Sequence, residues 1–577
     1  MTAPLDIGTH FPLIGSTRSL ASLPKDVLAS HSFILLSSFA VVGLVLYFIC
    51  HLVYDICFHP YAKYPGPFLA KFTDLYAGYH AWKGDIHLDM WRCHQIYGDK
   101  VRYAPNRLNV NTVTGLKSNQ FTPPVQHSAD ISVDIYKDGK PYLKSKNYAA
   151  MVHQATNTLT VRDRKDHGRR RRVIQQGLSD ATLRAFEPHM YEIINRFCDR
   201  MVQTVQEENK SKETGELMTR ARDDETWKPS RNMSEWCNFL AFDLMATFIF
   251  SGKYNMLERE QYRYVVQCIE ESNIRVSSIL QAPILKAFRM DRLFFPRAIV
   301  ARNMFLGFVG KLLRDTKKND RSQRKDLFEM LSHAKDPESG KGFSPEEIVA
   351  ESVTLVVAGA DTSATAMAAI FFYLSRNPDA YARAAAEVRA TFNSAEEIQG
   401  GAKLNSCRYL RACIDEAMRM SPSVGQTLAR EVPSGGAIVD GDFIPGGCDV
   451  GVPIYSIHHK EEIYSDPFNF NPERWMVEKE GASQQVLDMY AAYNPFSVGP
   501  RSCMGKGVAL VEMMATFAVV LFRLDFKMAD SDTAGGKPGK EYGRHRSSEY
   551  QLRDHITSAK EGPMLRFRPR VVRKVVV

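Results

Sequence analysis

One cysteine stands in a setting that suits metal ligation. Cys503 lies in the ten-residue stretch FSVGPRSCMG (496–505), and apolar, helix-forming sequence follows at once. A thiol at the start of a helix gains from the dipole and from backbone N–H groups, which favour the thiolate that binds a soft metal. Gly499 and Gly505 let the backbone approach a flat ligand, and Arg501 can pair with an anionic group on it. A lone cysteine before a helix is more often a buried, inert thiol than a metal ligand. Other residues must therefore show which of the two Cys503 is.

A second set of polar residues lies inside a long predicted helix. Ser344 begins a capping box with proline at the first helical position, and the helix can extend to Arg376, before Asn377-Pro378. Its apolar middle holds Ala358-Gly359-Ala360-Asp361-Thr362-Ser363. An acid and an alcohol are costly there unless they are hydrogen-bonded. Thr362 can bond back to the carbonyl of residue 358 and open a groove. The plain alternative is that Thr362 caps a kink and Asp361 makes a buried ion pair.

A third pattern joins two charged segments. Glu416 and Arg419 are three residues apart, so they share a helical face and can pair. On its own such a pair is usually a solvated surface pair. Here Pro472-Glu473-Arg474-Trp475 lies between this pair and Cys503.

Together these segments resemble the cytochrome P450 family, whose motifs are F-x-x-G-x-R-x-C-x-G (from Phe496 to Gly505), A-G-x-D/E-T, E-x-x-R and P-E-R-F/W. The resemblance covers roughly residues 60 to 570, with the motifs in the expected order. It implies a mainly α fold with small β-sheets. It also implies haem b, with Cys503 as the axial ligand of the iron, and electrons from NADPH through a separate reductase.

The resemblance also assigns roles to single residues. Asp361 and Thr362 would relay protons during oxygen activation, and Ala358 and Gly359 would leave room against the haem. Other residues would hold the Cys503 loop or the haem. The expected structural triad is Glu416, Arg419 and Arg474, and the expected cations for the haem propionates are His167, Arg171, Arg430 and Arg501, although family members often have Trp where His167 stands.

A basic run precedes the long helices. Arg162, Arg164, Lys165 and Arg169–Arg172 are close together, and a solvated face is the ordinary reading of such a run. The resemblance implies that this helix lies where NADPH–cytochrome P450 reductase docks, with cytochrome b5 as a further partner. A formal net charge of +9 on 577 residues suits an acidic partner or a membrane surface, and we expect no nucleic-acid binding.

The N-terminus carries a membrane signal. Ser32 to Val53 contains no Asp, Glu, Lys or Arg and is long enough to cross ~30 Å of hydrocarbon. A cleaved signal peptide would have a shorter apolar region nearer the start. We therefore expect a single-pass protein of the endoplasmic reticulum membrane with a cytosolic catalytic domain. Ten cysteines without a CxxC pair suit a reducing compartment. The expected parts are a luminal segment (1–31), an anchor (32–54), a proline-rich hinge (55–68) and the catalytic domain (69–577).

The rest of the chain reads as mostly helical with small sheets. Hydrophobic residues make up 44% and charged residues 24%, so a sizeable core is available. Alternation predicts a short β-hairpin or meander over 101–113, irregular structure follows over 114–160, and helical patterns extend from 163 to about 420. We expect a surface insertion at 207–230, Gly/Pro-rich β structure at 435–453 and a terminal strand with a basic tail at 565–577.

Three functional readings remain at this point. The first is a monooxygenase that inserts one oxygen atom from O2 into a lipophilic small molecule. The second is a reductase-independent isomerase or dehydratase, a class that commonly lacks the acid–alcohol pair, and the third is a non-enzymatic haem protein of membranes. The anchor, the hinge and the His458-to-Trp475 stretch most resemble filamentous-fungal members, many of which act in secondary metabolism. The sequence leaves hydroxylation, epoxidation, demethylation and ring coupling open.

Overall fold

The computed structural model describes residues 25–116, 135–136, 142–152, 155–203, 227–252, 254–318, 326–478 and 481–570. The chain divides into two units, Met1–Ala62 and Lys63–Val577. The first unit contains helix α1 (Lys25–Val53) and the π-helical turn η2 (Tyr54–Phe58). Within it, the 24-residue segment Leu35–Phe58 contains an 18-residue window with a mean hydropathy of 2.2, so it is long and apolar enough to span a membrane.

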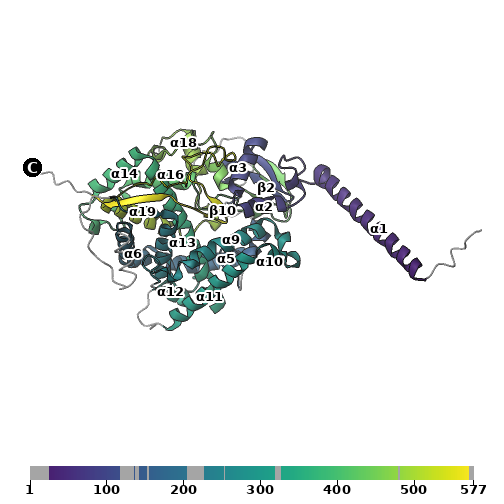
Figure 1. Cartoon of the computed structure of the whole chain (residues 1–577), viewed down its shortest axis with the longest axis horizontal. Coiled ribbons are helices and arrows are strands. Elements are labelled where there is room, and N and C mark those ends of the chain that lie inside the picture. The colour runs from purple at the N-terminus through teal and green to yellow at the C-terminus, as the bar shows by residue number, and fades with distance from the viewer. Residues whose placement is uncertain are drawn as a thin grey trace, which may run out of the picture. The chain divides into compact units, whose positions relative to one another are not determined.

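The second unit is mainly helical and surrounds a long central helix, α13 (Pro345–Arg376) (Figure 1). This helix is also long and apolar enough to cross a membrane, but most of it is buried in the core. The expected helical region is confirmed. The other α-helices of the described part of this unit are α2 (Leu75–Lys83), α3 (Ile86–Tyr97), α4 (Val113–Leu116), α5 (Arg164–Gly177), α6 (Asp180–Met201), α8 (Met233–Phe250), α9 (Tyr264–Gln281), α10 (Met290–Phe294), α11 (Pro296–Lys318), α12 (Leu327–His333), α14 (Pro378–Thr391), α15 (Ala402–Asn405), α16 (Arg408–Met420), α17 (Ile454–His458), α18 (Gln484–Ala492) and α19 (Lys506–Arg523).

The strands form small sheets. A five-stranded sheet has the order β1-β2-β8-β5-β3, and a three-stranded sheet has the order β4-β12-β9. β1 and β2 are antiparallel with Lys100 opposite Val110, which confirms the expected hairpin. Two further hairpins pair β6 with β7 and β10 with β11. The strand bounds are β1 (Lys100–Ala104), β2 (Arg107–Val110), β3 (Leu143–Lys144), β4 (Arg231–Asn232), β5 (Arg430–Glu431), β6 (Ala437–Val439), β7 (Asp442–Ile444), β8 (Asp449–Gly451), β9 (Leu524–Met528), β10 (Arg553–His555), β11 (Thr557–Ala559) and β12 (Met564–Pro569).

Two expectations fall partly outside the described residues. The insertion expected at 207–230 is described only from 227, and much of the irregular 114–160 region is likewise undescribed. The expected terminal strand is present as β12, whereas the basic tail at 571–577 lies outside the described residues.

The start of α13 is fixed by the capping box that the sequence predicts. The Ser344 hydroxyl accepts from the Glu347 N–H at 3.2 Å, and the Glu347 carboxylate accepts from the Ser344 N–H at 2.9 Å. Pro345 occupies the first helical position, and the next helix begins at Pro378. Because both ends are set by local chemistry, the register of the buried motif near Asp361 is set as well.

We predict that Ser344→Ala lowers the free energy of unfolding by about 1 kcal/mol, because one of the first N–H groups of α13 loses its acceptor. Urea unfolding followed by circular dichroism measures the change. Ser332→Ala is the matched control, since its hydroxyl bonds back to Phe328 O inside a helix, and it should stay within about 0.5 kcal/mol. Equal effects would show that the capping box does not fix the helix.

Candidate active site

The loop before α19 is folded tightly around Cys503. The Cys503 N–H donates to Phe496 O at 2.9 Å, and the Ser502 N–H donates to Gly499 O at 2.9 Å. Gly499 has a φ of +74°, in the left-handed region that favours glycine. A Cβ at position 505 would lie 3.8 Å from the Cys503 sulfur, an ordinary van der Waals distance, so Gly505 keeps a side chain away from this side of the sulfur. The loop therefore presents one thiol to a cavity that it borders.

Opposing effects act on this thiol. Burial raises the pKa of Cys503, whereas the N–H groups of Gly505 and Lys506 and the charge of Arg171 lower it. The expected backbone N–H groups are thus present, but the net direction is upward because burial dominates. A coordinated metal cation deprotonates a thiol outright. The loop is therefore suited to form the thiolate when a metal binds.

One cavity brings the predicted motifs together. It has an empty volume of about 1990 Å³, including space open to solvent, and its lining is mostly apolar. Cys503 and its loop border it, and so do Ala358, Gly359 and Thr362 of α13. The two motifs that lie far apart in the sequence therefore face one space, large enough for a flat prosthetic group and a further molecule.

Gly359 has a second role in packing. A Cβ at this position would come within 2.4 Å of the Met245 side chain of α8. The absence of a side chain at Gly359 therefore lets α8 approach α13, and it also leaves more space in the cavity. This packing role was not part of the sequence-based expectation.

The acid and the alcohol of α13 point to different surroundings. The Thr362 hydroxyl donates to Ala358 O at 2.6 Å, as predicted, and Thr362 borders the cavity. Asp361 is buried, accepts a hydrogen bond from Thr557 and forms an ion pair with Lys560 at 3.5 Å. The plain alternative of a buried ion pair therefore describes the contacts of Asp361 in this structure, while Thr362 remains directed to the cavity.

Positive side chains gather at the cavity. Arg430 donates to Leu428 O at 2.9 Å, Arg501 to Val161 O at 2.6 Å and Lys144 to Leu159 O at 2.6 Å. Among the described residues no carboxylate forms an ion pair with these three side chains. Burial lowers the pKa of Arg501 to about 10 and that of Lys144 well below its usual value, and neighbouring cations add to both effects. The site is therefore electrostatically prepared for an anion.

The remaining predicted cations differ from each other. Arg171 donates to Ser502 O at 2.7 Å, so it also braces the Cys503 loop. Burial and the neighbouring cations lower the pKa of His167 to about 3, so its ring is neutral near pH 7. His167 borders the cavity but adds no positive charge of its own. Lys144, which the sequence reasoning missed, places a further amino group there, and burial lowers the pKa of that group.

A buried charge cluster lies around Glu416. Its carboxylate accepts from Arg419 at 2.9 Å and from Arg474 at 3.0 Å, so the structure brings the predicted triad together. Trp475 donates a further hydrogen bond at 2.9 Å. Both Glu416 and Arg419 are fully buried. The several bonds offset the desolvation of these charges, which pairing alone often fails to do.

This cluster connects to the Cys503 loop through a histidine. Arg419 donates to His458 O at 2.7 Å, and the His458 imidazole contacts Arg419 O at 3.1 Å. The other ring nitrogen of His458 accepts from Asn494 N–H at 3.1 Å, two residues before Phe496. Burial lowers the pKa of His458 to about 3, so the ring is neutral and can both donate and accept. The triad thus reaches the loop by direct hydrogen bonds.

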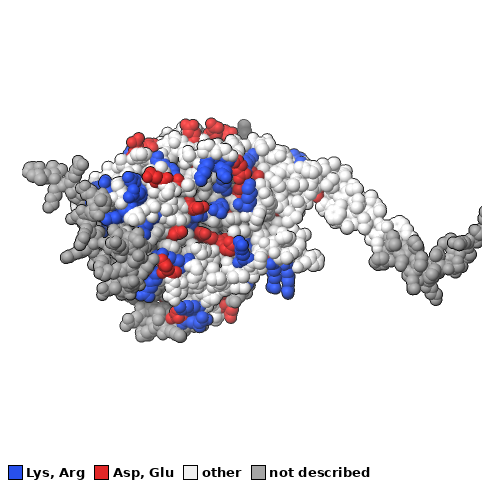
Figure 2. Space-filling model, viewed as in Figure 1, with Lys and Arg blue, Asp and Glu red and all other residues white. Residues whose placement is uncertain are grey.

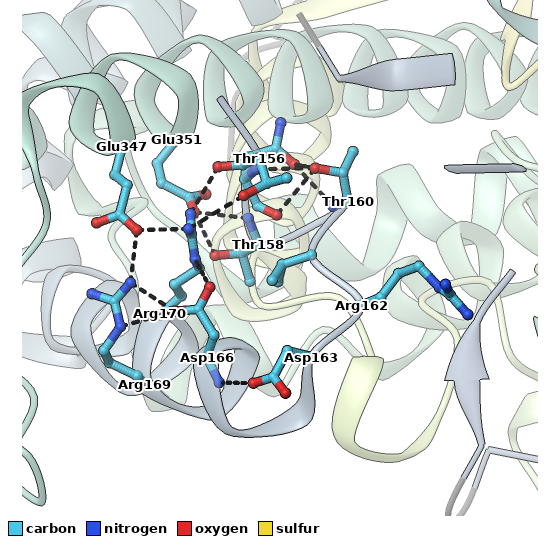
Figure 3. Close-up of polar contacts among 12 residues, drawn as sticks. Thr156, Thr158, Thr160, Arg162, Asp163, Asp166, Arg169, Arg170, Glu347 and Glu351 are labelled. Carbon is cyan, nitrogen blue, oxygen red and sulfur yellow. Dashed lines mark hydrogen bonds and ion pairs between the residues drawn. The ribbon is translucent and has the colours of Figure 1, made fainter. Parts of the chain in front are cut away.

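The basic run on α5 is largely neutralised. Arg169 pairs with Asp166 at 2.7 Å, and Arg170 reaches Glu347 at 2.6 Å and Glu351 at 3.2 Å (Figure 3). The same helix therefore uses its arginines to hold the start of α13. Arg172 also pairs, with Asp336, and Arg162 with Glu431, which leaves Arg164 and Lys165 of the run exposed. The sequence left this run as a solvated face or a docking surface. The structure adds that most of its members pair with acidic residues, several of them from other segments.

Several residues of the site carried no sequence signal that we used. Lys144, Thr557 and Lys560 come from short strands or their ends, where spacing predicts no partner. His458 lies in a stretch that we had read only for its family likeness.

A thiol, an alcohol and cations without a carboxylate partner border one cavity, and this set suits an anionic, metal-holding group bound through cysteine. The cytochrome P450 family model matches residues 65–541. The chain is 43% identical over 533 residues to the cytochrome P450 monooxygenase poxM of Penicillium oxalicum, covering 92% of this chain and 94% of that one. It is 42% identical to atnE of Emericella nidulans, covering 93% and 98%, and 40% identical to AKT7 of Alternaria alternata, covering 90% and 94%, both cytochrome P450 monooxygenases.

The chain belongs to the cytochrome P450 family. It is a haem-thiolate monooxygenase that receives electrons from a redox partner and acts on a small molecule. The first of the three functional readings is thus confirmed, together with the expected fold class and cofactor.

We predict that Glu416→Gln costs about 3–5 kcal/mol in the free energy of unfolding, because it leaves Arg419 buried without a counter-charge. Urea unfolding and the haem content of the purified protein measure the effect. Arg411→Gln is the control on the same helix: its pair with Asp415 is partly exposed, so the loss should stay within about 1 kcal/mol. Normal haem content and stability in Glu416→Gln would contradict a structural role of the triad.

Proposed function

We propose that this monooxygenase oxidises a lipophilic small molecule in secondary metabolism. The observation that carries the proposal is that Cys503 and Thr362 border the same, mostly apolar cavity. Apolar side chains from distant segments form much of its wall, and a few hydroxyl and amide groups accompany them. The apolar side chains of the wall include Met151, Leu280, Leu355, Leu428, Ile454 and Ile556. Such a lining favours an apolar substrate that carries few polar groups.

Cys503 is the residue that we propose would hold the haem iron, through its sulfur. Bound haem supplies the oxygen-activating redox chemistry, which a cysteine thiolate ligand favours. The protein's own part is to present the sulfur from a rigid loop. Phe496 closes the loop through its carbonyl, Gly499 permits its turn, and Gly505 keeps a side chain away from one side of the sulfur.

The uncompensated cations are the proposed partners of the two haem propionates. Arg430, Arg501 and Lys144 now donate to carbonyl groups, and a carboxylate is a stronger acceptor for them. Arg171 links this group to the Cys503 loop. His167 is the proposed neutral hydrogen-bond donor at the same site, because its cationic neighbours disfavour a further charge.

Thr362 and Asp361 are the proposed proton relay. The Thr362 hydroxyl is held at the cavity wall by the hydrogen bond that it donates to Ala358 O. In this position its oxygen can accept from a group in the cavity, and it can donate to that group once the bond to Ala358 O is released. To pass a proton to the Thr362 hydroxyl, the Asp361 side chain must first break its contact with Thr557 or with Lys560. We therefore infer that Lys560 holds the Asp361 side chain in place between turnovers.

The proposed redox partner is NADPH–cytochrome P450 reductase, with cytochrome b5 as an additional donor. On the face seen in Figure 2, acidic and basic side chains lie side by side and do not separate into large fields. Arg164 and Lys165 on α5 and Lys506 at the start of α19 are exposed. Lys506 follows the Cys503 loop closely, so an acidic partner bound here would come near the haem.

The proposed location is the membrane of the endoplasmic reticulum, with the catalytic domain in the cytosol. The N-terminal helix supplies the anchor. The second unit also exposes large apolar side chains at Phe288, Leu293, Phe294 and Val300, between the end of α9 and the start of α11. Clustered exposed apolar side chains of this kind suit contact with a lipid surface.

We predict that the reduced, carbon monoxide-bound protein shows the red-shifted Soret band of thiolate-ligated haem and that Cys503→Ser abolishes this band. The reason is that serine cannot supply a soft thiolate ligand. The difference spectrum of the dithionite-reduced full chain in detergent measures it. Cys448→Ser serves as the control, because that cysteine is buried elsewhere. A band that survives in Cys503→Ser would overturn the ligand assignment.

We predict that Thr362→Ala lowers the product formed per NADPH by at least about tenfold and releases peroxide instead, since a positioned proton donor contributes roughly 10²-fold or more. Product, NADPH and peroxide are measured with reductase and a substrate found by screening. Thr391→Ala removes the same kind of back-bond on α14 and should leave the ratio unchanged. Unaltered coupling in Thr362→Ala would require another proton path.

A further inference from the structure

Arg107 on β2 is a buried arginine whose hydrogen-bond donors are not all used. The residue is 5% exposed, and its Nε–H has no hydrogen-bond partner among the described residues. Its Nη1 group donates to Oε1 of Gln281, the last residue of α9. No carboxylate in the described part of the chain forms an ion pair with Arg107. Because a buried charge without a partner is costly and buried polar groups are normally bonded, this guanidinium is suited to bind an anion.

A chain of hydrogen bonds connects Arg107 to the large cavity of the active site. Gln281 Nε2 donates to Gln426 Oε1 at 2.6 Å, and Gln426 Nε2 donates to Asp554 Oδ1 at 2.8 Å. A guanidinium can only donate and a carboxylate accepts, so the two ends of the chain fix the orientation of both amides. Gln426 borders the cavity, and so does Leu280, which precedes Gln281. The charge of Arg107 therefore lies two hydrogen bonds behind the cavity wall.

The acids near Arg107 do not pair with it. Asp449 lies opposite Arg107 in the parallel pairing of β2 with β8, yet its carboxylate accepts from Ser145 Oγ at 2.6 Å. Burial raises the pKa of Asp449 and that of Asp74, just before α2, and the charge of Arg107 partly opposes both rises. The plain alternative is that Arg107 only balances these two acids through space. This alternative does not explain why the guanidinium donates to a neutral amide although an acid lies opposite it in the sheet.

The other polar groups of this part of the wall suit a carboxylate less well. Three hydroxyl groups of residues that border the cavity already donate to the protein: those of Ser423, Thr427 and Thr557. Their oxygens can accept a further hydrogen bond, but their protons are engaged. The Gln426 amide, in contrast, has a second N–H that no described residue accepts. Arg107 and Gln426 together therefore provide the donors that an anionic group needs.

We propose that Arg107 binds the carboxylate of the substrate, so that the substrate class of this monooxygenase is a lipophilic carboxylic acid. The carboxylate takes the place of Gln281 Oε1 as the acceptor for Arg107, and the second N–H of Gln426 is a further donor. A carboxylate is a stronger acceptor than an amide, and its two oxygens match the planar guanidinium. The mostly apolar wall receives the rest of the molecule. This inference rests on the proposed function, because it assigns one end of the substrate to a site.

Titration of the haem-loaded full chain in detergent tests the binding of the carboxylate. The probes are decanoic, dodecanoic and tetradecanoic acids and their methyl esters, and the change in the Soret band gives each dissociation constant. The wild type should bind the acids more tightly than the esters. Arg107→Gln should weaken acid binding by about tenfold or more and leave ester binding nearly unchanged, since hydrogen bonds to charged groups are the strong ones. Arg107→Lys should keep part of the preference, because the charge remains but the fork is lost.

The control for the loss of a buried arginine is Arg200→Gln. Arg200 lies on α6, is 2% exposed and bonds to Gln203 and to main-chain carbonyl groups. This variant should bind the acids and the esters as the wild type does. Equal losses for acids and esters in Arg107→Gln would show that Arg107 only supports the fold, and they would overturn the proposal.

An almost isosteric variant tests the same site without removing the arginine. Gln281→Glu places a carboxylate of the protein beside Arg107, so it should compete with the substrate and weaken acid binding by about tenfold, with ester binding unchanged. Gln281→Leu removes the competing acceptor and should bind the acids at least as tightly as the wild type. Undiminished acid binding in Gln281→Glu, with a normal thiolate spectrum, would overturn the proposal.

Turnover separates this inference from the proposed function. With reductase, NADPH and O2, Arg107→Gln should raise KM for the acids and leave kcat little changed, because Arg107 holds the end of the substrate and not the reacting carbon. If the wild type oxidises the esters as readily as the acids, the carboxylate site is overturned and the proposed function stands. If the wild type shows a normal thiolate spectrum but oxidises neither these probes nor other lipophilic molecules, the proposed function itself is refuted.

Discussion

The positive charge around the cavity is the constraint on which the site depends. Arg430, Arg501 and Lys144 are drawn together by the five-stranded sheet, the Cys503 loop and the segments beside α5, and no carboxylate among the described residues pairs with them. Their mutual repulsion opposes folding until an anion binds. A dianionic cofactor removes this repulsion, so cofactor binding and stability of the native state are coupled. The cations at the site therefore lower the stability of the native state when no anion is bound.

The loop is also held by the buried Glu416 cluster, which reaches it through His458 and Asn494. Glu416 gathers two guanidinium groups and an indole N–H, and Arg419 extends the cluster to the carbonyl of His458. Breaking any one member leaves charge buried in a dry interior. The two groups therefore differ. The charges of the Glu416 cluster are paired within the protein and hold the loop, whereas the cations at the cavity have no carboxylate partner among the described residues and can bind an anionic ligand.

The sequence predicted the parts of the site that follow local rules. The capping box of α13, the bond from Thr362 to Ala358 O and the Glu416–Arg419 pair all depend on residues within four positions of each other. The meeting of Cys503 with Thr362 was reached through family likeness, because spacing alone does not specify which helices meet. Lys560 and Lys144 could not be predicted, since their partners depend on how short strands pack against helices. The ion-pair partners of the basic run on α5 were not predicted, because several of these acids, such as Glu347, lie far along the chain.

Buried imidazole rings make the stability of this fold depend on pH. Burial holds the pKa of His94 and His555 at about 4 and that of His167 and His458 at about 3, against a usual 6.5. Each ring is neutral in the native state and takes up a proton more readily once the chain unfolds. The stability that they support is complete above about pH 6.5 and falls as pH drops toward their folded values. Acid would therefore weaken the contacts through which His458 holds the Cys503 loop. We expect the enzyme to be stable near neutral pH and to lose stability in acid.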